Sequence, residues 1–216
     1  MEKTPQKLEL ILKYFSDFTP VQLGQFAALE ELYKDWNSKI NVISRKDIDS
    51  LYEKHVLHAL SIAAVFHCAP GIEILDLGTG GGFPGIPLAI FFPEVNFHLA
   101  DSIGKKLKVV EAVAAAVNLK NVTVQHTRAE DIKNKKFDAV VSRAVAPLGD
   151  LWRWSKPLIR KKIIANGNTI NGLICLKGGD LAQEISDSKC RPRITQIHDL
   201  FKEESFKDKY LLHVSV

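Results

Sequence analysis

The sequence predicts an α/β protein with a mostly parallel sheet and a set of helices in front of it. The segment Ile72–Phe92, IEILDLGTGGGFPGIPLAIFF, combines a short apolar run, a glycine cluster and a second apolar run, a pattern typical of a strand, a tight turn and a helix. The next expected strand, Val95–Ala100, is followed by Asp101. Asp101 comes about 20 residues after Gly78, the first glycine, and βαβ nucleotide folds carry at this distance an acid that binds the two ribose hydroxyls. The expected ligand therefore carries a nucleoside.

Two registers of the glycine cluster predict different nucleosides. Gly80-x-Gly82-x-x-Gly85 matches the dinucleotide fingerprint, in which a helix N-terminus receives a pyrophosphate. The register Asp76-x-Gly78-x-Gly80-x-Gly82 instead places a carboxylate at the mouth of the loop, where it would repel a pyrophosphate but suit the sulfonium or ammonium end of S-adenosylmethionine. We favour the methyl donor, and a glycine-rich turn without a ligand is the third interpretation.

Length and composition favour one main domain with an appendage. With 216 residues, 46% of them hydrophobic, the chain can bury roughly 70% of its unfolded surface in one core. The three widely spaced cysteines indicate a reducing compartment and no structural metal. The start lacks a signal design and no apolar run reaches the ~20 residues that span a bilayer, so we expect a soluble, cytoplasmic protein without a membrane partner. The net charge of +4 is compatible with a polyanionic partner.

Residues 1–70 are expected to form an N-terminal helical cap. Apolar residues at helical spacing predict a short first helix over about 5–15, and Thr19-Pro20 is typical of a cap and first turn opening a second helix that ends near Ser38. Asp47 is the expected N-cap of a third helix running to about Phe66.

Lys54, His55 and His58 lie together on that third helix. As a metal pair the two histidines lack a third ligand nearby, so a locally hydrogen-bonded histidine or a contact with substrate is favoured over zinc.

Residues 71–216 are expected to form the sheet core. The first strand ends at Leu77, and the following strands are expected at Val95–Ala100, Val122–His126, Phe137–Ser142, Leu173–Lys177, Ile194–Ile197 and Tyr210–Val216, the last two as an antiparallel pair. Ser102 is the expected cap of a helix over about 104–117, and further helices are expected from Pro147 to about Arg160 and over 181–186.

The loop Thr127–Asp131 follows the third strand. Because ligands lie outside the carboxyl ends of strands in a doubly wound sheet, this loop should flank an adenine, with the backbone N–H groups of Ala129 and Glu130 reading its ring edge.

Several motifs together resemble one family: WNSKINVIS (36–44), KHVLHALS (54–61), ILDLGTGGGFPGIPLAI (74–90), DSIGKK (101–106), RAED (128–131) and VVSRAVAPL (140–148). The chain is similar to the bacterial 16S ribosomal RNA guanine-N7 methyltransferase G family, also called glucose-inhibited division protein B. The resemblance covers about Tyr33 to Lys177. It departs from the family pattern at His58, where many members carry aspartate, and at Ala59, where they carry serine.

The resemblance implies a class I S-adenosylmethionine-dependent, Rossmann-like fold with a seven-stranded sheet. It also implies methylation of guanine N7 in the decoding-region (530) loop of small-subunit ribosomal RNA, and it places donor contacts on Gly78, Phe83, Ala129, Glu130 and Arg143. With the glycine loop and the tip of the second strand, the predicted cofactor residues are Gly78, Gly80, Gly82, Phe83, Asp101, Ser102, Ala129, Glu130 and Arg143.

The chemistry of the expected site fits guanine N7. Exocyclic amines usually meet an Asp/Asn-Pro-Pro-aromatic motif after the fourth strand, where this chain has Ser142-Arg143-Ala144. Cys175 lies in an apolar run and reads as core, not as a nucleophile. N7 carries a lone pair and no proton, so we name no catalytic acid or base. Arg143 could hold the donor carboxylate, an RNA phosphate or guanine O6, or form a structural ion pair.

The expected partner is 16S ribosomal RNA or the small subunit, bound by a monomer that does not bind DNA. Arg153, Lys156 and Arg160 would form one basic stripe beside Trp152 and Trp154, although a solvated helix face over buried tryptophans is an equal interpretation. The further predicted RNA contacts are Lys54, His55, Arg128 and Lys177. A nicotinamide-dependent oxidoreductase and an RNA-binding assembly factor with a vestigial cofactor site remain as alternatives, and naked RNA, a precursor particle and the finished subunit remain open as substrates.

Overall fold

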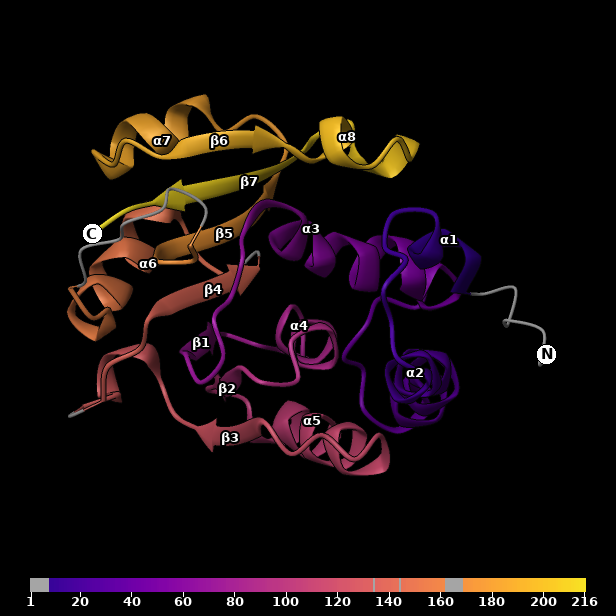
Figure 1. The fold of residues 1–216 in the computed structure, drawn as a ribbon. Helices are drawn as coiled ribbons and strands as arrows, with labels where there is room; N and C mark the ends of the chain where they lie inside the picture. The colour runs from indigo at the N-terminus through magenta and orange to yellow at the C-terminus, as the bar shows by residue number, and fades with distance from the viewer. Residues whose placement is uncertain (1–7, 134, 144, 162–168) are drawn as a thin grey trace.

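The computed structural model describes residues 8–133, 135–143, 145–161 and 169–216. Its centre is a seven-stranded sheet in the order β3-β2-β1-β4-β5-β7-β6, in which β1 to β5 run parallel and β7 runs antiparallel to both of its neighbours (Figure 1). The strands are β1 Glu73–Leu77, β2 Asn96–Asp101, β3 Val122–His126, β4 Ala139–Arg143, β5 Gly172–Gly178, β6 Arg193–Gln196 and β7 Lys209–Val214. The predicted mostly parallel sheet and its closing antiparallel pair are confirmed.

The N-terminal helices begin with α1 Glu9–Leu12 and α2 Pro20–Lys39. The predicted cap of α2 is confirmed, because Thr19 and Gln22 form a reciprocal capping box. The amide of Gln22 also donates to the carbonyl of Ile90 over 2.9 Å, which ties the start of α2 to the end of α4 Gly85–Phe91.

The predicted third helix is wrong at its start. Instead of a helix capped by Asp47, the chain forms a 3-10 turn, η2 Ile48–Ser50, a π-helical segment, η3 Tyr52–Leu57, and only then α3 His58–Val65. The Asp47 carboxylate makes no cap hydrogen bond, because it accepts instead from Nζ of Lys54, over 2.5 Å.

The second half of the chain supplies helices on both faces of the sheet. They are α5 Gly104–Ala116, α6 Leu148–Ser155, α7 Ala182–Ser188 and α8 Ile197–Leu200, with 3-10 turns η4 Ala129–Asp131, η5 Lys156–Leu158 and η6 Glu204–Phe206. The predicted cap of α5 by Ser102 is wrong. The carboxylate of Asp101 accepts the N–H of Ile103 over 2.8 Å, and the exposed Ser102 side chain makes no cap bond.

The two faces of the sheet are covered by different helices. In Figure 1, α2, α4 and α5 lie to the right of the strands and α6 lies to the left. Side chains alternate accordingly along the strands: Ile174 packs with α1 to α5 in one buried cluster, whereas Leu173 and Cys175 pack under α6 in the other. Cys175 is fully buried, and burial raises the pKa of its thiol to about 12, which confirms that it belongs to the core.

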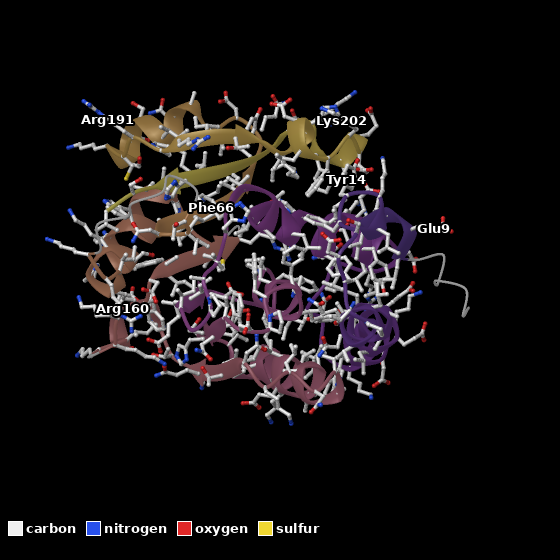
Figure 2. The ribbon with its side chains drawn as sticks, in the orientation of Figure 1. Glu9, Tyr14, Phe66, Arg160, Arg191 and Lys202 are labelled. Atoms are coloured by element: carbon white, nitrogen blue, oxygen red, sulfur yellow. The ribbon has the colours of Figure 1, made fainter. Side chains whose placement is uncertain are left out.

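Apolar side chains of the N-terminal helices join the sheet in one cluster, as Phe26 and Leu29 of α2 do with Ile74 of β1. The division into a cap over 1–70 and a core over 71–216 stays a prediction. Figure 2 shows Arg160, Arg191 and Lys202 on the outside of the molecule and Phe66 inside it. Among the described helices, none combines the length and apolar character needed to cross a membrane.

Candidate active site

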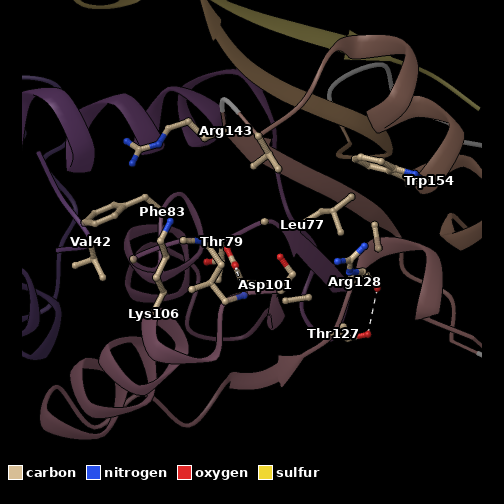
Figure 3. Close-up of a pocket in the computed structure, with 18 of the residues that line it drawn as sticks. Val42, Leu77, Thr79, Phe83, Asp101, Lys106, Thr127, Arg128, Arg143 and Trp154 are labelled. Atoms are coloured by element: carbon tan, nitrogen blue, oxygen red, sulfur yellow. Dashed lines mark hydrogen bonds between the residues drawn. The ribbon is translucent and has the colours of Figure 1, made fainter. Parts of the chain in front are cut away.

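A cavity of about 520 Å³ opens where the parallel strands β1, β2 and β4 end (Figure 3). Doubly wound sheets bind their ligands at these carboxyl ends of the strands. Of the predicted cofactor residues, those that line the cavity are Gly78, Gly80, Phe83, Asp101, Ser102, Ala129, Glu130 and Arg143.

Gly82 is outside the lining of this cavity. A Cβ atom at this position would lie 2.7 Å from Cγ1 of Ile86 and 3.0 Å from the hydroxyl of Tyr33, and its φ is +96°. Tyr33 donates to the carbonyl of Gly81 over 2.7 Å. The missing side chain at Gly82 thus lets the loop pack against α2 and α4. Because Gly82 does not line the cavity, it is not positioned to contact a ligand there.

Gly80 is the glycine that leaves open space. Its φ is +57°, a left-handed conformation that favours glycine, and a Cβ built there would have no atom within 4 Å. Because Gly80 also lines the cavity, a ligand can approach its backbone directly.

The loop has few backbone donors left for a phosphate. Seven N–H groups of residues 78–86 are already bonded within the chain. Those of Gly78 and Thr79 donate to the Ala100 carbonyl, Gly80 to Asp101 Oδ2, Gly82 and Phe83 to the Thr79 carbonyl, Gly85 to Asp76 Oδ2 and Ile86 to the Gly82 carbonyl. A dinucleotide fingerprint needs the helix N-terminus free for the pyrophosphate. Here a carboxylate occupies the start of α4, so the geometry argues against the nicotinamide register.

Asp76 is not at the mouth of the loop, and that part of the sequence interpretation is wrong. Its side chain is fully buried behind the loop, where Oδ2 accepts from the Thr79 hydroxyl over 2.6 Å and from the Gly85 N–H over 2.8 Å. Burial raises the pKa of Asp76 to about 7, although both hydrogen bonds oppose the shift. Asp76 therefore holds the loop in shape, and it does not line the cavity.

Asp101, unlike Asp76, lines the cavity. Oδ2 accepts the N–H of Gly80 and Oδ1 accepts the N–H of Ile103, both over 2.8 Å. These bonds fix the side chain rigidly. Each carboxylate oxygen keeps a further lone pair, so the pair can still accept from two vicinal hydroxyl groups.

Arg143 at the end of β4 forms a cluster with Phe83 and His55 (Figure 3 shows Arg143 near Phe83). Its Nη2 lies 2.9 Å from Nδ1 of His55, its Nη1 donates to the Lys54 carbonyl over 3.4 Å, and its guanidinium carbon lies 5.1 Å from the centre of the Phe83 ring. The π-helical turn η3 brings Lys54 and His55 to this position, and π-helical turns frequently occur at functional sites.

The protonation states in this cluster follow from burial. Burial lowers the pKa of Arg143 to about 10, with the charge of Asp76 opposing, so the guanidinium stays cationic at neutral pH. Burial and the charge of Arg143 lower the pKa of His55 to about 3. His55 is therefore neutral. Since its Nδ1 accepts from Arg143, its proton lies on Nε2, which is buried without a partner in the described part of the chain.

Arg143 forms no ion pair among the described residues, where its bonds go to the neutral ring of His55 and a backbone carbonyl. The alternative of a purely structural ion pair is therefore not supported there. A cation that lines the cavity and is held by neutral groups suits an anionic part of a ligand.

The predicted RNA contacts are not all brought together. Arg128 lines the cofactor cavity, whereas Lys54, His55 and Lys177 line a neighbouring cavity of about 490 Å³ that shares Arg143. The Lys177 side chain is only 8% exposed and pairs with Glu184 at 2.7 Å, so it is already engaged.

The predicted single basic stripe is wrong at Arg160. Helix α6 ends at Ser155, because Pro157 has no N–H and its ring cannot follow a helix interior. Arg160 lies beyond that break, where it pairs with Glu73 and, over 2.7 Å, with Asp138. Glu73 and Asp138 lie at the amino ends of β1 and β4, whereas the cavity lies at their carboxyl ends. Arg160 is therefore at the opposite end of the parallel strands from the cavity.

Some lining residues were missed by the sequence analysis. Val42, Thr79 and Lys106, which Figure 3 labels, line the cavity, as does Val145. Trp154, which the sequence analysis named only beside the basic stripe, lines it too. Thr79 lies inside the glycine loop, and Lys106 is the last residue of the motif DSIGKK. Their positions within these motifs could have indicated that both residues line the cavity. Val42 comes from the connection after α2, and its place depends on tertiary packing.

The cavity fits S-adenosylmethionine. Gly80 gives open backbone, Asp101 presents a fixed carboxylate that can accept from hydroxyl groups, and Arg143 is a cation in no ion pair within the described ranges. The backbone donors that a pyrophosphate needs are occupied. A nucleoside with a carboxylate and no phosphate meets all of these conditions.

Two solved structures share this fold. A SAM-dependent methyltransferase from Aquifex aeolicus superposes with a TM-score of 0.52 at 14% identity, over 80% of this chain and 98% of that one. TrmN from Thermus thermophilus superposes with a TM-score of 0.53 at 16% identity, over 74% of this chain and 47% of that one. At these identities the likeness shows the fold, which is that of the class I S-adenosylmethionine-dependent methyltransferases.

Sequence comparisons narrow the class to a family. The family model described as rRNA small subunit methyltransferase G matches residues 22–210. A protein of Phocaeicola vulgatus named Ribosomal RNA small subunit methyltransferase G is 57% identical over 211 residues, 97% of this chain and 99% of the relative. A protein of Cytophaga hutchinsonii with the same name is 50% identical over 96% of this chain and 99% of the relative. The chain belongs to the rRNA small subunit methyltransferase G family, which confirms the resemblance.

Proposed function

We propose that the protein transfers a methyl group from S-adenosylmethionine to N7 of a guanine in the decoding-region (530) loop of 16S ribosomal RNA. The observation that supports this most strongly is the glycine loop, which offers open backbone at Gly80 but has its helix N-terminus occupied by Asp76. The names of its relatives, ribosomal RNA small subunit methyltransferases G, supply the substrate class.

The proposed donor contacts follow the lining of the cavity. Asp101 accepts from the ribose hydroxyls, and Gly80 allows the donor to lie against the loop. Ala129 and Glu130, in the 3-10 turn after β3, flank the adenine. When bound, the donor supplies a methyl group activated by a positively charged sulfur.

Arg143 is assigned to the carboxylate of the donor. A guanine attacked at N7 becomes positively charged, so an arginine in contact with its ring would oppose the reaction. The bonds of Arg143 to His55 and to the Lys54 carbonyl hold the guanidinium on the Phe83 side of the cavity, where it can bind a carboxylate. In this role Arg143 orients the donor and takes no part in proton transfer.

The acceptor requires no general base. N7 of guanine attacks with an in-plane lone pair, and no proton leaves with the transfer. Neither His55, whose Nδ1 accepts from Arg143, nor the buried Cys175 is placed as a base or nucleophile for it. Rate enhancement then comes mainly from holding donor and acceptor in line, which contributes about 7 to 11 kcal/mol in oriented intramolecular reactions.

The protein is proposed to work in the cytoplasm as a monomer on 16S ribosomal RNA or the small subunit. Nucleoside mass spectrometry of the ribosomal RNA from a deletion strain tests the function in the cell. We expect one N7-methylguanosine of the 530 loop to disappear and to return when the intact gene is restored. An unchanged N7-methylguanosine content in the deletion strain would contradict the proposal.

A further inference from the structure

A basic groove lies beside the cofactor cavity, on the face of the sheet covered by α6. It consists of two adjoining cavities of about 700 and 610 Å³ that share Lys136 and Pro157. One wall is formed by residues 129, 130, 132, 133, 135 and 136 of the segment between β3 and β4, and the other wall is α6 with η5. In Figure 1 this segment lies below α6 at the left of the molecule.

The groove is strongly cationic. Its lining includes Lys133, Lys135, Lys136, Arg153, Lys156, Arg160 and Lys161, and Glu130 is the one acid among the described residues that line it. Lys133, Lys136, Lys156 and Lys161 are exposed.

The positive charge of the groove is largely uncompensated. Within the described residues none of its five lysines forms an ion pair, whereas Arg153 pairs with Asp150 at an exposed site and Arg160 pairs with Glu73 and Asp138. The net charge of the whole chain is only +4, so a large part of the excess is concentrated here. Such a surface attracts a polyanion.

The groove is continuous with the cofactor cavity. Ala129, Glu130 and Trp154 line both the groove and the cofactor cavity. Trp154 is half-buried, and the guanidinium carbon of Arg153 lies 5.8 Å from its ring centre. An aromatic ring between a cationic groove and a cavity is the arrangement with which proteins bind unpaired nucleotides, by stacking a base and contacting the backbone phosphates.

From these contacts we infer that the groove binds the single-stranded RNA that flanks the methylated guanine, with Lys133 and Lys156 contacting phosphates from opposite walls and Trp154 marking the turn into the cofactor cavity. This inference rests on the proposed function and adds the path of the substrate. It differs from the single helical stripe, because Arg160 lines the far end of the groove with its charge paired to Glu73 and Asp138, and the lysines of the segment before β4 supply the unpaired charge.

A matched pair of double variants tests the groove. Lys133→Gln/Lys156→Gln removes one charge from each wall. Lys108→Gln/Lys120→Gln removes the same charge from exposed lysines that line neither the groove nor the cofactor cavity. Binding of a fluorescein-labelled single-stranded RNA is followed by anisotropy over a series of salt concentrations.

For the groove variant we expect the slope of log K against log salt to fall in magnitude by about 0.7 per lysine, and the affinity to fall roughly tenfold near 0.1 M salt. The Lys108→Gln/Lys120→Gln variant should match the wild type in RNA affinity and in salt slope. Both should bind S-adenosylhomocysteine with unchanged affinity in calorimetry, and the groove variant should show a raised KM for the RNA substrate with unchanged kcat.

Equal RNA affinity and salt slope in the two double variants would overturn the inference. So would a groove variant that keeps its RNA affinity but loses binding to polyglutamate, because the groove would then serve an acidic protein. The two proposals fail separately. If the wild type methylates no RNA the proposed function fails, and if both variants methylate RNA with the wild-type KM only the groove fails.

Discussion

The pair Gly85→Ala and Gly24→Ala tests how the glycine loop is held. Both glycines are helical, Gly24 inside α2 and Gly85 at the start of α4. A Cβ at Gly24 would meet no atom within 4 Å, whereas a Cβ at Gly85 would lie 2.7 Å from Oδ2 of Asp76 and 2.8 Å from Cγ of Leu99. The same substitution should therefore have opposite effects at the two sites.

The magnitudes follow from the contacts. Gly24→Ala should stabilise the protein by about 0.4 to 1 kcal/mol, because alanine has less backbone freedom to lose on folding. Gly85→Ala gains the same term, but it overpacks a buried site at about 1 to 3 kcal/mol and displaces a carboxylate whose hydrogen bonds contribute about 1.5 to 3 kcal/mol each. The smallest net loss that these terms allow, about 3 kcal/mol, corresponds to a Tm lowered by about 6 to 12 °C in a protein of this size.

Thermal unfolding of both variants beside the wild type measures the difference, with S-adenosylhomocysteine calorimetry as a second readout. We expect Gly24→Ala to raise Tm slightly and keep the wild-type affinity. Gly85→Ala should lower Tm and weaken binding, because the Asp76 contact shapes the loop. A Gly85→Ala protein as stable as Gly24→Ala would refute the assignment of Asp76 as the buried support of the loop.

Three further substitutions test the site. Asp101→Asn should weaken S-adenosylhomocysteine binding about tenfold in calorimetry by removing a charged acceptor, and Asp208→Asn, an exposed control, should not. Arg143→Lys should slow methyl transfer about 10- to 100-fold with little change in Tm, because lysine cannot bond His55 and Lys54 together; a wild-type rate would contradict this. Burial raises the pKa of Asp76 to about 7 from an ordinary 3.8, so the stability associated with its protonated form is present below pH 4 and is lost as the pH rises through 7. Asp76→Asn should therefore gain stability over the wild type between pH 4 and 7, up to about 4 kcal/mol in urea unfolding, and a gain independent of pH would contradict the burial.

The sequence predicted the sheet well because its strands have clear ends. β3 begins and ends where expected, and β2 ends in the predicted Asp101. The open glycine was also accessible to prediction, since a left-handed position close to a ligand requires a residue without a Cβ, as at Gly80.

Other features depended on contacts that sequence spacing does not contain. β1 is buried on both faces, so alternation could not say which face Asp76 occupies, and it points behind the loop. Nothing in the sequence indicated that Lys177 has a partner, but the fold places the carboxylate of Glu184 2.7 Å from its Nζ. In contrast, Pro157 was a visible signal that α6 could not continue to Arg160.

The central claim is that this cavity presents a methyl donor to guanine N7 in ribosomal RNA. Transfer of labelled methyl from S-adenosylmethionine to naked 16S RNA, a precursor particle and the finished small subunit, followed by digestion to nucleosides, tests it most directly. We predict label in N7-methylguanosine from at least one of these substrates, abolished by excess S-adenosylhomocysteine. Label in a different nucleoside, or in none from all three substrates, would contradict the claim.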